Sequence, residues 1–409
     1  MSNILIIGGG FAGVWAAAGI KRQARTSGLG EADLRVTLVD ASDDMVIRPR
    51  LYERDPQAYR VSLDRVLGPI GVRRIAGTVT TIATDSKTVT AIERDGRPVL
   101  LGYDKLVLAA GSRTIRSTLP GAEHLFDVDQ MAAAARLQDH LRRLPTRLDG
   151  EGQYTAIVIG AGFTGIEVAC ETSDRLREIS GAPERVRVVL VERENVVGPG
   201  LGSGPRPEIQ AALKTLGIEQ RLGTSVIEIT DGGVRLSDGM RISADTVVWT
   251  AGTLASPLTE QVPGERDRWG RLVVDEYLRV VGVPDVYAAG DTAAAVAEPG
   301  HPVMQSCQHA VPQGKFVGQN VAADLLGLSP VSFVPDPYVT CLDLGSYGAV
   351  LTIGWDRTVQ LIKQAAKDLK RNINTSWIYP PVDDATTILD QADWRTTWPT
   401  AEVSNQQTA

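Results

Sequence analysis

The chain has 409 residues, of which 43% are hydrophobic and 22% charged, and its formal net charge is −7. This length exceeds what one ordinary core needs and indicates two or three domains. The sequence has no tract of Lys and Arg, which argues against a nucleic-acid partner, and no apolar run of about 18 residues that would predict a transmembrane helix. The amino terminus carries no signal-peptide features, so we expect a cytoplasmic protein.

The number and spacing of the cysteines argue against a disulfide framework and against a zinc site. The sequence has three, Cys170, Cys307 and Cys341. They form no CxxC pair and no His/Cys cluster with the spacing of zinc ligands. We therefore expect neither a secreted disulfide framework nor a bound metal.

The first motif lies near the amino terminus. Residues 3–7 (NILII) read as a buried strand, Gly8 to Gly13 (GGGFAG) follow, and an Ala-rich helix runs from Val14. A second strand, residues 35–39, ends at Asp40. A GxGxxG turn between strand and helix, with an acid after the next strand, is a dinucleotide-binding pattern. Its glycines permit a tight turn and close approach of a pyrophosphate, and the acid accepts ribose hydroxyls.

The same series recurs later in the chain. Residues 155–159 (TAIVI) read as a strand, Gly160 to Gly165 (GAGFTG) open a helix, and residues 187–191 end at Glu192. The first glycine and the acid are 32 residues apart in both copies. Each copy also has a later strand that closes on Ala-Gly. The repeat predicts an α/β fold with two Rossmann-like doubly wound domains.

The rest of the chain supplies additions to these two units. We expect helices over residues 130–144 and 308–326, and a strand over 286–291 that returns to the first sheet and ends in Gly-Asp. After about residue 332 we expect short β-like segments and a helix over residues 358–373. The predicted domains are therefore 1–120 with 254–335, then 153–253, then a small C-terminal α+β segment, 336–409.

Glu192 bears on the choice of nicotinamide cofactor. A carboxylate at this position favours a free ribose 2′-hydroxyl and repels a 2′-phosphate. This favours NADH over NADPH, although the neighbouring Arg193 could soften the preference.

The order of the motifs GGGFAG, LVLAAGS, GAGFTGIE, VVWTAGT and VYAAGD resembles the two-dinucleotide-binding-domain flavoproteins of the pyridine nucleotide-disulfide reductase superfamily. The resemblance covers nearly the whole chain and implies FAD on the first unit and NAD(P)H on the second. The implied FAD positions are Gly8, Gly10, Phe11, Ala12, Gly13, Asp40, Val79, Ala110, Gly111, Gly290 and Asp291. The implied NADH positions are Gly160, Gly162, Phe163, Thr164, Gly165, Glu192 and Gly252.

Two segments narrow the choice among the branches of the superfamily. Residues 41–51 contain no cysteine, which excludes a dithiol relay after Asp40. Residues 304–314 (MQSCQHAVPQG) resemble the AQxAxQQG stretch of type II NADH:quinone dehydrogenases, with Pro312 in place of a Gln. The resemblance implies that this stretch lies beside the flavin ring and the quinone pocket. Residues 45–53 loosely resemble the flavin-proximal segment of that family.

Three side chains are candidates for orienting the reactants and supplying a proton: Glu167, Gln308 and His309. Glu167 could instead complement the dipole of its helix, and His309 could be a structural histidine. Cys341 resembles the position of a redox cysteine in sulfide:quinone reductases, and Cys307 could approach it. We favour small apolar roles for both.

The expected reaction passes a hydride from NADH to the flavin and then two electrons to a quinone or similar small acceptor. Three alternatives stay open: a soluble NADH oxidase or aromatic-compound reductase, a sulfide:quinone-type enzyme using Cys307 and Cys341, and an NADH-binding redox-sensing flavoprotein. The helix expected over residues 358–373 is amphipathic. It could cover a domain or attach weakly to the inner face of the plasma membrane. A homodimer is also left open.

Overall fold

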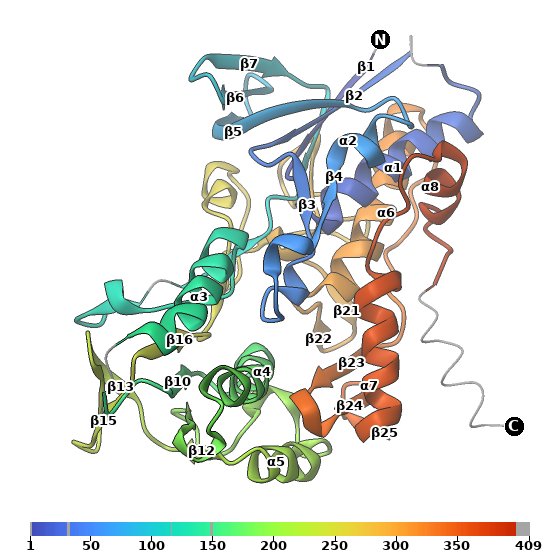
Figure 1. Ribbon diagram of the computed structural model, residues 1–409. Coiled ribbons are helices and arrows are strands. Elements are labelled where there is room, and N and C mark those ends of the chain that lie inside the picture. Colours follow the sequence, from blue (N-terminus) through green and yellow to red (C-terminus); the bar gives the residue numbers. More distant parts are fainter. Residues whose placement is uncertain (1, 31–32, 116, 148–149, 398–409) are drawn as a thin grey trace, which may run out of the picture.

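A computed structural model describes residues 2–30, 33–115, 117–147 and 150–397. In Figure 1 two α/β blocks lie one above the other, and the C-terminal segment runs along one side of both. The upper block contains the first glycine-rich turn and the lower block contains the second. The fold class is therefore the doubly wound α/β architecture that the repeat predicts.

The upper block is built on a seven-stranded sheet with the order β19-β8-β1-β2-β5-β6-β7. Its strands are β1 (Ser2–Ile7), β2 (Leu34–Asp40), β5 (Arg73–Ala83), β6 (Thr88–Glu93), β7 (Pro98–Gly102), β8 (Lys105–Leu108) and β19 (Val286–Ala288). β1 pairs in parallel with β2 and β8, and its apolar residues are buried because helices cover the sheet. β19 returns from late in the sequence to pair in parallel with β8.

The lower block has a four-stranded parallel sheet with the order β12-β11-β10-β16. Its strands are β10 (Thr155–Ile159), β11 (Arg187–Val191), β12 (Ile218–Arg221) and β16 (Thr246–Trp249). A three-stranded antiparallel meander, β13 (Val226–Thr230), β14 (Gly233–Leu236) and β15 (Arg241–Ser243), packs beside it. Every residue of β10 is buried, as expected of the central strand of a covered parallel sheet.

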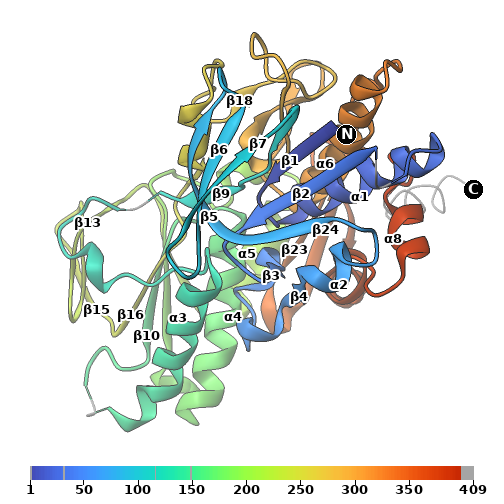
Figure 2. The same cartoon turned by 90° about the horizontal axis from the view of Figure 1, so that it is seen from above.

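Two helices of the upper block pack backbone against backbone. α1 (Phe11–Thr26) and α6 (Cys307–Leu325) lie side by side in Figures 1 and 2. A Cβ added at Gly314 would lie 2.4 Å from the Ala12 carbonyl oxygen, and one at Gly318 would lie 2.6 Å from the Ala16 carbonyl oxygen. The glycines of α6 are therefore required by close packing on α1.

Two short strands, β9 (Ser112–Thr114) and β17 (Thr253–Ala255), pair antiparallel where the chain passes between the blocks. The remaining helices are α2 (Leu63–Leu67), α3 (Met131–Arg143), α4 (Phe163–Ser180), α5 (Arg206–Thr215) and α8 (Ala385–Gln391). The short pairs are β3 (Asp44–Val46) with β4 (Arg60–Ser62), β18 (Leu272–Val273) with β20 (Ala293–Ala294), and β21 (Val296–Glu298) with β22 (His301–Pro302).

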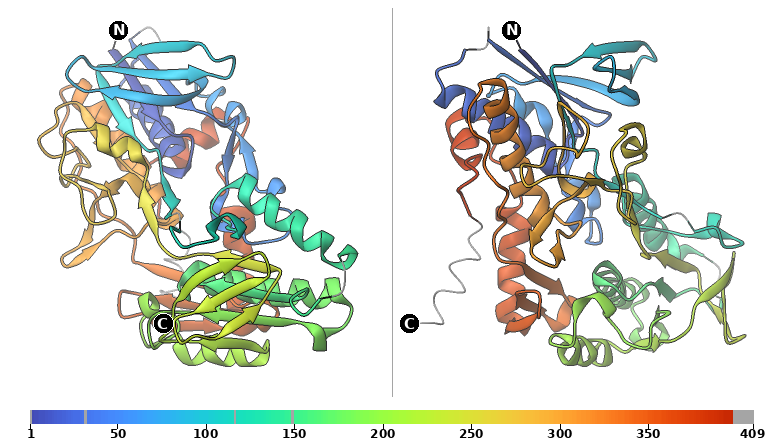
Figure 3. Two further views of the ribbon diagram at one scale, coloured as in Figure 1. Left: turned by 90° about the vertical axis from the view of Figure 1, so that its left-hand side faces the viewer. Right: turned by 180° about the vertical axis from the view of Figure 1, so that it is seen from behind.

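The C-terminal segment corrects one expectation. Residues 358–373 do not form one helix: Thr358–Ile362 is strand β25, and helix α7 spans Lys363–Asn372. β25 pairs with β24 (Ala349–Ile353), which pairs with β23 (Val339–Asp343). α7 lies alongside these strands in Figure 3 and buries Ala366 and Lys370, so it covers a domain face. The apolar residues on both sides of Ile362 happen to follow helical spacing, because the strand and the helix each contribute an apolar face.

The described part of the chain contains no helix that is long and apolar enough to cross a bilayer. Within the same residues, no three His, Cys, Asp or Glu side chains gather in a way that could hold a metal ion.

Candidate functional site

The first glycine-rich turn leaves a free helix N-terminus. Gly8 has φ of 109°, and a Cβ at Gly13 would lie 1.8 Å from the Gly8 carbonyl oxygen, so both positions require glycine. A Cβ at Gly10 would meet nothing within 4 Å, and Gly10 is exposed. No side chain caps the start of α1 at Gly10. The backbone N–H groups of the first turn, at Phe11 and Ala12, are thus open to an anionic ligand.

The second turn repeats this geometry. Gly160 has φ of 103°, and a Cβ at Gly165 would lie 1.8 Å from the Gly160 carbonyl oxygen. Gly162 is exposed with nothing within 4 Å of an added Cβ, and no side chain caps α4. Thr164 is exposed and Phe163 half-buried at the helix start. The chain therefore has two equivalent turns, one in each block, whose free backbone N–H groups suit an anionic ligand.

Each acid at the end of the second strand anchors its own glycine turn. The Gly9 N–H donates to Asp40 Oδ2 at 2.6 Å, and the Ser42 N–H donates to Oδ1 at 2.7 Å. In the second block the Ala161 N–H donates to Glu192 Oε2 at 2.8 Å, and the Glu194 N–H donates to Oε1 at 3.1 Å. These matching contacts hold both carboxylates at the mouth of their turns, where ribose hydroxyls would reach them.

A hollow of about 300 Å³ lies beside the end of β2. It is lined by Ala41, Gly77, Thr78, Thr80, Ile92, Glu93 and Arg94. The lining residues Thr78 and Thr80 flank Val79 on β5. This is the position at which the resemblance implies that the Val79 backbone lies against an adenine.

The other end of the first site lies where β8 and β19 finish. Gly111 has nothing within 4 Å of an added Cβ, and Gly290 has φ of 67°. Ser112 Oγ donates to Asp291 Oδ2 at 2.6 Å, while Asp291 Oδ1 has no hydrogen-bond partner among the described residues. A free carboxylate oxygen here fits a ribityl hydroxyl. The residues present thus fit an FAD. The spare oxygen of Asp291 and the open space at the glycines are the two observations that support this fit.

The start of α6 presents two buried polar atoms without partners. Gln313 accepts the Gly290 N–H at 3.0 Å through its oxygen, but its Nε2 has no partner. His309 is 1% exposed and its Nε2 also lacks a partner. Buried donors are normally satisfied, so both atoms indicate a missing ligand or water on this side of the helix.

His309 and Gln308 differ in what they can do. Burial lowers the pKa of His309 to about 4, and its ring stacks on Tyr338 with centroids 5.2 Å apart. Nδ1 faces the Met304 N–H at 3.2 Å, so His309 is a neutral donor through Nε2 at neutral pH. Gln308 donates to the Pro337 carbonyl at 3.2 Å and accepts from the Val339 N–H at 3.4 Å. Its side chain therefore holds the start of β23.

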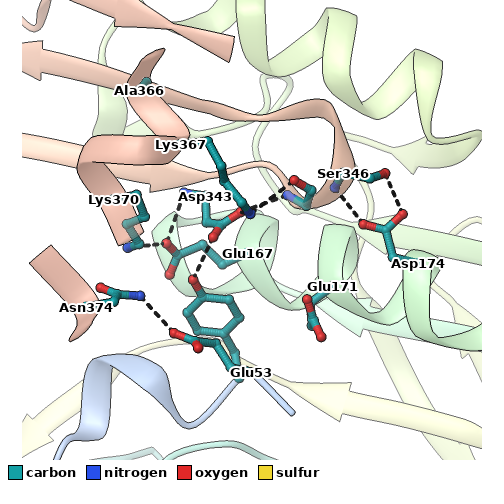
Figure 4. A network of polar contacts seen from close by, with 12 residues as sticks. Glu53, Glu167, Glu171, Asp174, Asp343, Ser346, Ala366, Lys367, Lys370 and Asn374 are labelled. Atoms are coloured by element: carbon teal, nitrogen blue, oxygen red, sulfur yellow. Dashed lines mark hydrogen bonds and ion pairs between the residues drawn. The ribbon is translucent and has the colours of Figure 1, made fainter. Parts of the chain in front are cut away.

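Glu167 lies in a buried polar network between α4 and the C-terminal segment (Figure 4). It is 4% exposed, and its Oε1 accepts from Lys370 Nζ at 2.8 Å and from the Asp343 N–H at 3.1 Å. Lys370 also donates to the Cys341 carbonyl at 3.0 Å. Burial raises the pKa of Glu167 to about 7 against the opposing effect of the Lys370 ammonium. Burial thus favours the neutral form of this carboxyl, and the Lys370 ammonium favours its charged form.

Sequence reasoning missed the partners in this network. Lys370 looks like a surface residue of an amphipathic helix, and yet it is 6% exposed. Asp343 accepts from Tyr52 Oη at 3.2 Å and pairs with Lys367. The sequence indicates these partners only weakly: Tyr52 lies in residues 45–53, which loosely resemble the flavin-proximal segment of the family. The network joins three segments that are distant in the sequence.

The cysteines do not form a redox pair in this structure. All three are free, and burial raises the pKa of Cys307 to about 11 and that of Cys341 to about 12. At neutral pH both side chains are therefore thiols, which are weak nucleophiles.

We expect Cys307→Ser and Cys341→Ser, singly or together, to leave the rates of NADH oxidation and acceptor reduction within about twofold of the wild type, because neither thiol is activated. Stopped-flow flavin reduction and reoxidation measure both steps. Cys170→Ser, at a fully buried position on α4, controls for the burial of a hydroxyl. Loss of sulfide oxidation in the Cys341 variant alone would instead support the sulfide:quinone alternative.

Comparisons with known proteins agree with the fold and the paired turns. The family model described as pyridine nucleotide-disulphide oxidoreductase matches residues 2–314. An NADH dehydrogenase-like protein of Mycobacterium tuberculosis is 45% identical over 386 residues, covering 94% of this chain and 96% of that protein. A type II NADH:quinone oxidoreductase of the same organism is 28% identical over 380 residues, covering 85% and 77%.

A demethylphylloquinone reductase of Synechocystis is 30% identical over 359 residues, covering 86% of each chain. The solved structure of an NDH2 from Plasmodium falciparum in complex with NADH aligns over 96% of this chain and 97% of that one, with a TM-score of 0.78 and 15% identity. The latter similarity concerns the fold. The chain belongs to the pyridine nucleotide-disulphide oxidoreductase family, whose members are enzymes that use a flavin and a pyridine nucleotide.

Proposed function

We propose that this protein oxidises NADH through a bound FAD and passes two electrons to a quinone or a similar small acceptor. The observation that carries the proposal is the pair of equivalent glycine turns. Each has an uncapped helix start, an open central glycine and an acid held by the turn's own backbone. One chain thus offers sites for two dinucleotides, as electron transfer between them requires.

FAD is assigned to the first block, residues 1–120 with 254–335, and NADH to the second, residues 153–253. The hollow beside Asp40 and the spare oxygen of Asp291 support this order, because the first would hold the adenine end of an FAD and the second would accept a ribityl hydroxyl. In the second block, Gly252 has φ of 79° where the chain leaves β16. It is the expected position for the nicotinamide end of the second cofactor.

The flavin, when bound, supplies the acceptor for hydride and the store for two electrons. The chain supplies position, charge and a proton. Glu167 is our candidate for the proton, because burial raises the pKa of its carboxyl and Lys370 holds that carboxyl in one place. His309 offers a neutral donor at the start of α6, and Gln308 positions β23. We assign His309 and Gln308 to orienting the reactants and not to supplying the proton.

Two observations support a quinone as the electron acceptor. Two of the relatives carry names that describe quinone reduction, and the stretch at the start of α6 resembles that of type II enzymes. Pro312, inside α6, takes the place of a Gln and leaves the Gln308 backbone carbonyl without its usual helix donor. This departure removes an amide side chain from the stretch and argues against a strict preference for quinones, so other small acceptors are included in the test.

The test is anaerobic reduction of the purified holoprotein by NADH or NADPH, followed by mixing with ubiquinone and menaquinone analogues, oxygen and sulfide. We expect rapid flavin bleaching by NADH and reoxidation by quinones. Reoxidation by oxygen alone would indicate an oxidase. Negligible reoxidation by every acceptor, despite fast bleaching, would indicate a redox sensor and contradict the proposal.

Glu192→Gln is expected to raise the KM for NADH about tenfold or more and to reduce the preference for NADH over NADPH. The carboxylate is the group proposed to accept the ribose hydroxyls, and a hydrogen bond to a charged group contributes about 1.5–3 kcal/mol. Its loss also removes the negative charge that would repel a 2′-phosphate. Steady-state kinetics with both nucleotides measure the ratio.

Glu194→Gln is the matched control, because Glu194 is half-exposed and offers its side chain to Arg193 alone among the described residues. We expect its kinetics to equal those of the wild type. An unchanged NADH/NADPH ratio in the Glu192 variant would contradict the assignment of this carboxylate to the ribose.

A further inference from the structure

Arg48 lies at the first residue of a one-turn helix, Arg48–Arg50, in the segment between β3 and β4. Its guanidinium reaches three separate parts of the chain. Nη1 donates to Ser112 Oγ at 2.9 Å and faces Asp291 Oδ2 at 3.4 Å. Nη2 pairs with Asp129 Oδ1, and Nε donates to the Asp129 carbonyl at 3.1 Å. The side chain is thus fixed by a forked set of contacts.

These contacts place a cation at the carboxylate assigned to the ribityl chain. Ser112 and Arg48 both engage Oδ2 of Asp291, so Oδ1 remains free to accept a hydroxyl. The Arg48 side chain is 32% exposed and that of Asp291 is 17% exposed, so one side of the cluster is open. Gly111, directly before Ser112, also has open space at its Cα.

We propose that Arg48 is a positioning and charge-setting residue of the FAD site: it holds Asp291 in the orientation that binds the ribityl chain, and it raises the reduction potential of the bound flavin. This inference rests on the assignment of FAD to the first block. Reduction adds negative charge to the flavin, and a nearby fixed cation stabilises that charge. Removing the cation therefore favours the oxidised form and lowers the potential.

A purely structural role is the competing explanation. Asp129 also accepts the Thr114 N–H at 2.8 Å, so Arg48 and Asp129 together tie the segment before α3 to β9. A clamp of this kind would stabilise the protein without affecting the flavin. The chain offers a matched control in Arg50, which lies two residues away on the same turn but pairs with Glu53 and Tyr379.

The experiment compares Arg48→Gln, Arg48→Lys and Arg50→Gln with the wild type. FAD affinity is measured by rebinding to the apoprotein, and the potential by anaerobic titration against reference dyes. For Arg48→Gln we expect at least tenfold weaker FAD binding and a tenfold shift toward the oxidised form, which for a two-electron couple is about 30 mV. Arg48→Lys keeps the charge without the fork, so its potential should fall between the two. Arg50→Gln should match the wild type in both.

Equal potentials and FAD affinities in Arg48→Gln and the wild type would overturn the inference. So would a loss of apoprotein thermal stability in Arg48→Gln with no change in potential, which is the signature of the clamp alone. A wild-type protein that neither carries nor rebinds FAD would contradict the proposed function itself. The two failures are therefore distinguishable.

Discussion

Replacing Gly162 by valine is expected to abolish reduction of the flavin by NADH while leaving the fold and the FAD content unchanged. A Cβ added at this exposed position meets no protein atom within 4 Å, and Gly162 has no positive φ, so we expect the fold to tolerate the substitution. The same space is where a pyrophosphate must approach the start of α4. Stopped-flow bleaching of the flavin with NADH should show a loss of at least a hundredfold, with an unchanged flavin spectrum and melting temperature.

Gly165→Val provides the contrast within the same motif. Its Cβ would lie 1.8 Å from the Gly160 carbonyl oxygen, so α4 must move away from β10. We expect this variant to misfold or to unfold at a much lower temperature. If Gly162→Val kept its fold and still reduced its flavin with NADH at the normal rate, the second turn would not be the NADH site.

Lys370→Met is expected to lower the free energy of unfolding by about 3–5 kcal/mol, the usual effect of removing one partner from a buried ion pair. Both partners are almost fully buried: the side chain of Lys370 is 8% exposed and that of Glu167 is 5% exposed. Without the ammonium, the carboxylate of Glu167 has no opposite charge within hydrogen-bond distance among the described residues. Urea unfolding at pH 8 measures the loss.

The size of this effect should depend on pH. The pKa of Glu167 in the folded protein is raised from the ordinary 4.5 to about 7, so the folded state binds this proton more tightly than the unfolded state. Its contribution to stability therefore falls as pH rises from about 4.5 through 7. Lys370→Met should be less destabilising at pH 5.5, where Glu167 can become neutral. Adding Glu167→Gln should restore most of the stability at pH 8, and failure of that rescue would contradict a charge-based explanation.

The parts of the fold that could be predicted are those set by local patterns. Strands β10 and β11 have the bounds expected from the sequence, because short apolar runs between turn residues have few alternatives in a covered parallel sheet. The two glycine turns were predictable for the same reason. Their function depends on residue types within a few positions of one another.

The side chains that complete the site could not be predicted, because their partners are distant in the sequence. The sequence marks Glu167 as a candidate, but its partner Lys370 lies 203 residues later, in a lysine-rich segment with no local signal for a buried ion pair. Arg48 meets Asp291 across 243 residues, and no local pattern marks that pair. The error over residues 358–373 is of the same kind, since pairing with β24 decided which half became a strand.

The packing of α1 against α6 has a consequence for how the first block can move. The backbones of the two helices meet without room for a methyl group at Gly314 and Gly318, which lie against Ala12 and Ala16 of α1. Neither helix can slide or separate without breaking that contact. The glycine turn before α1 and the start of α6 therefore keep a constant spacing, and the two helices act together as one rigid strut of the upper block.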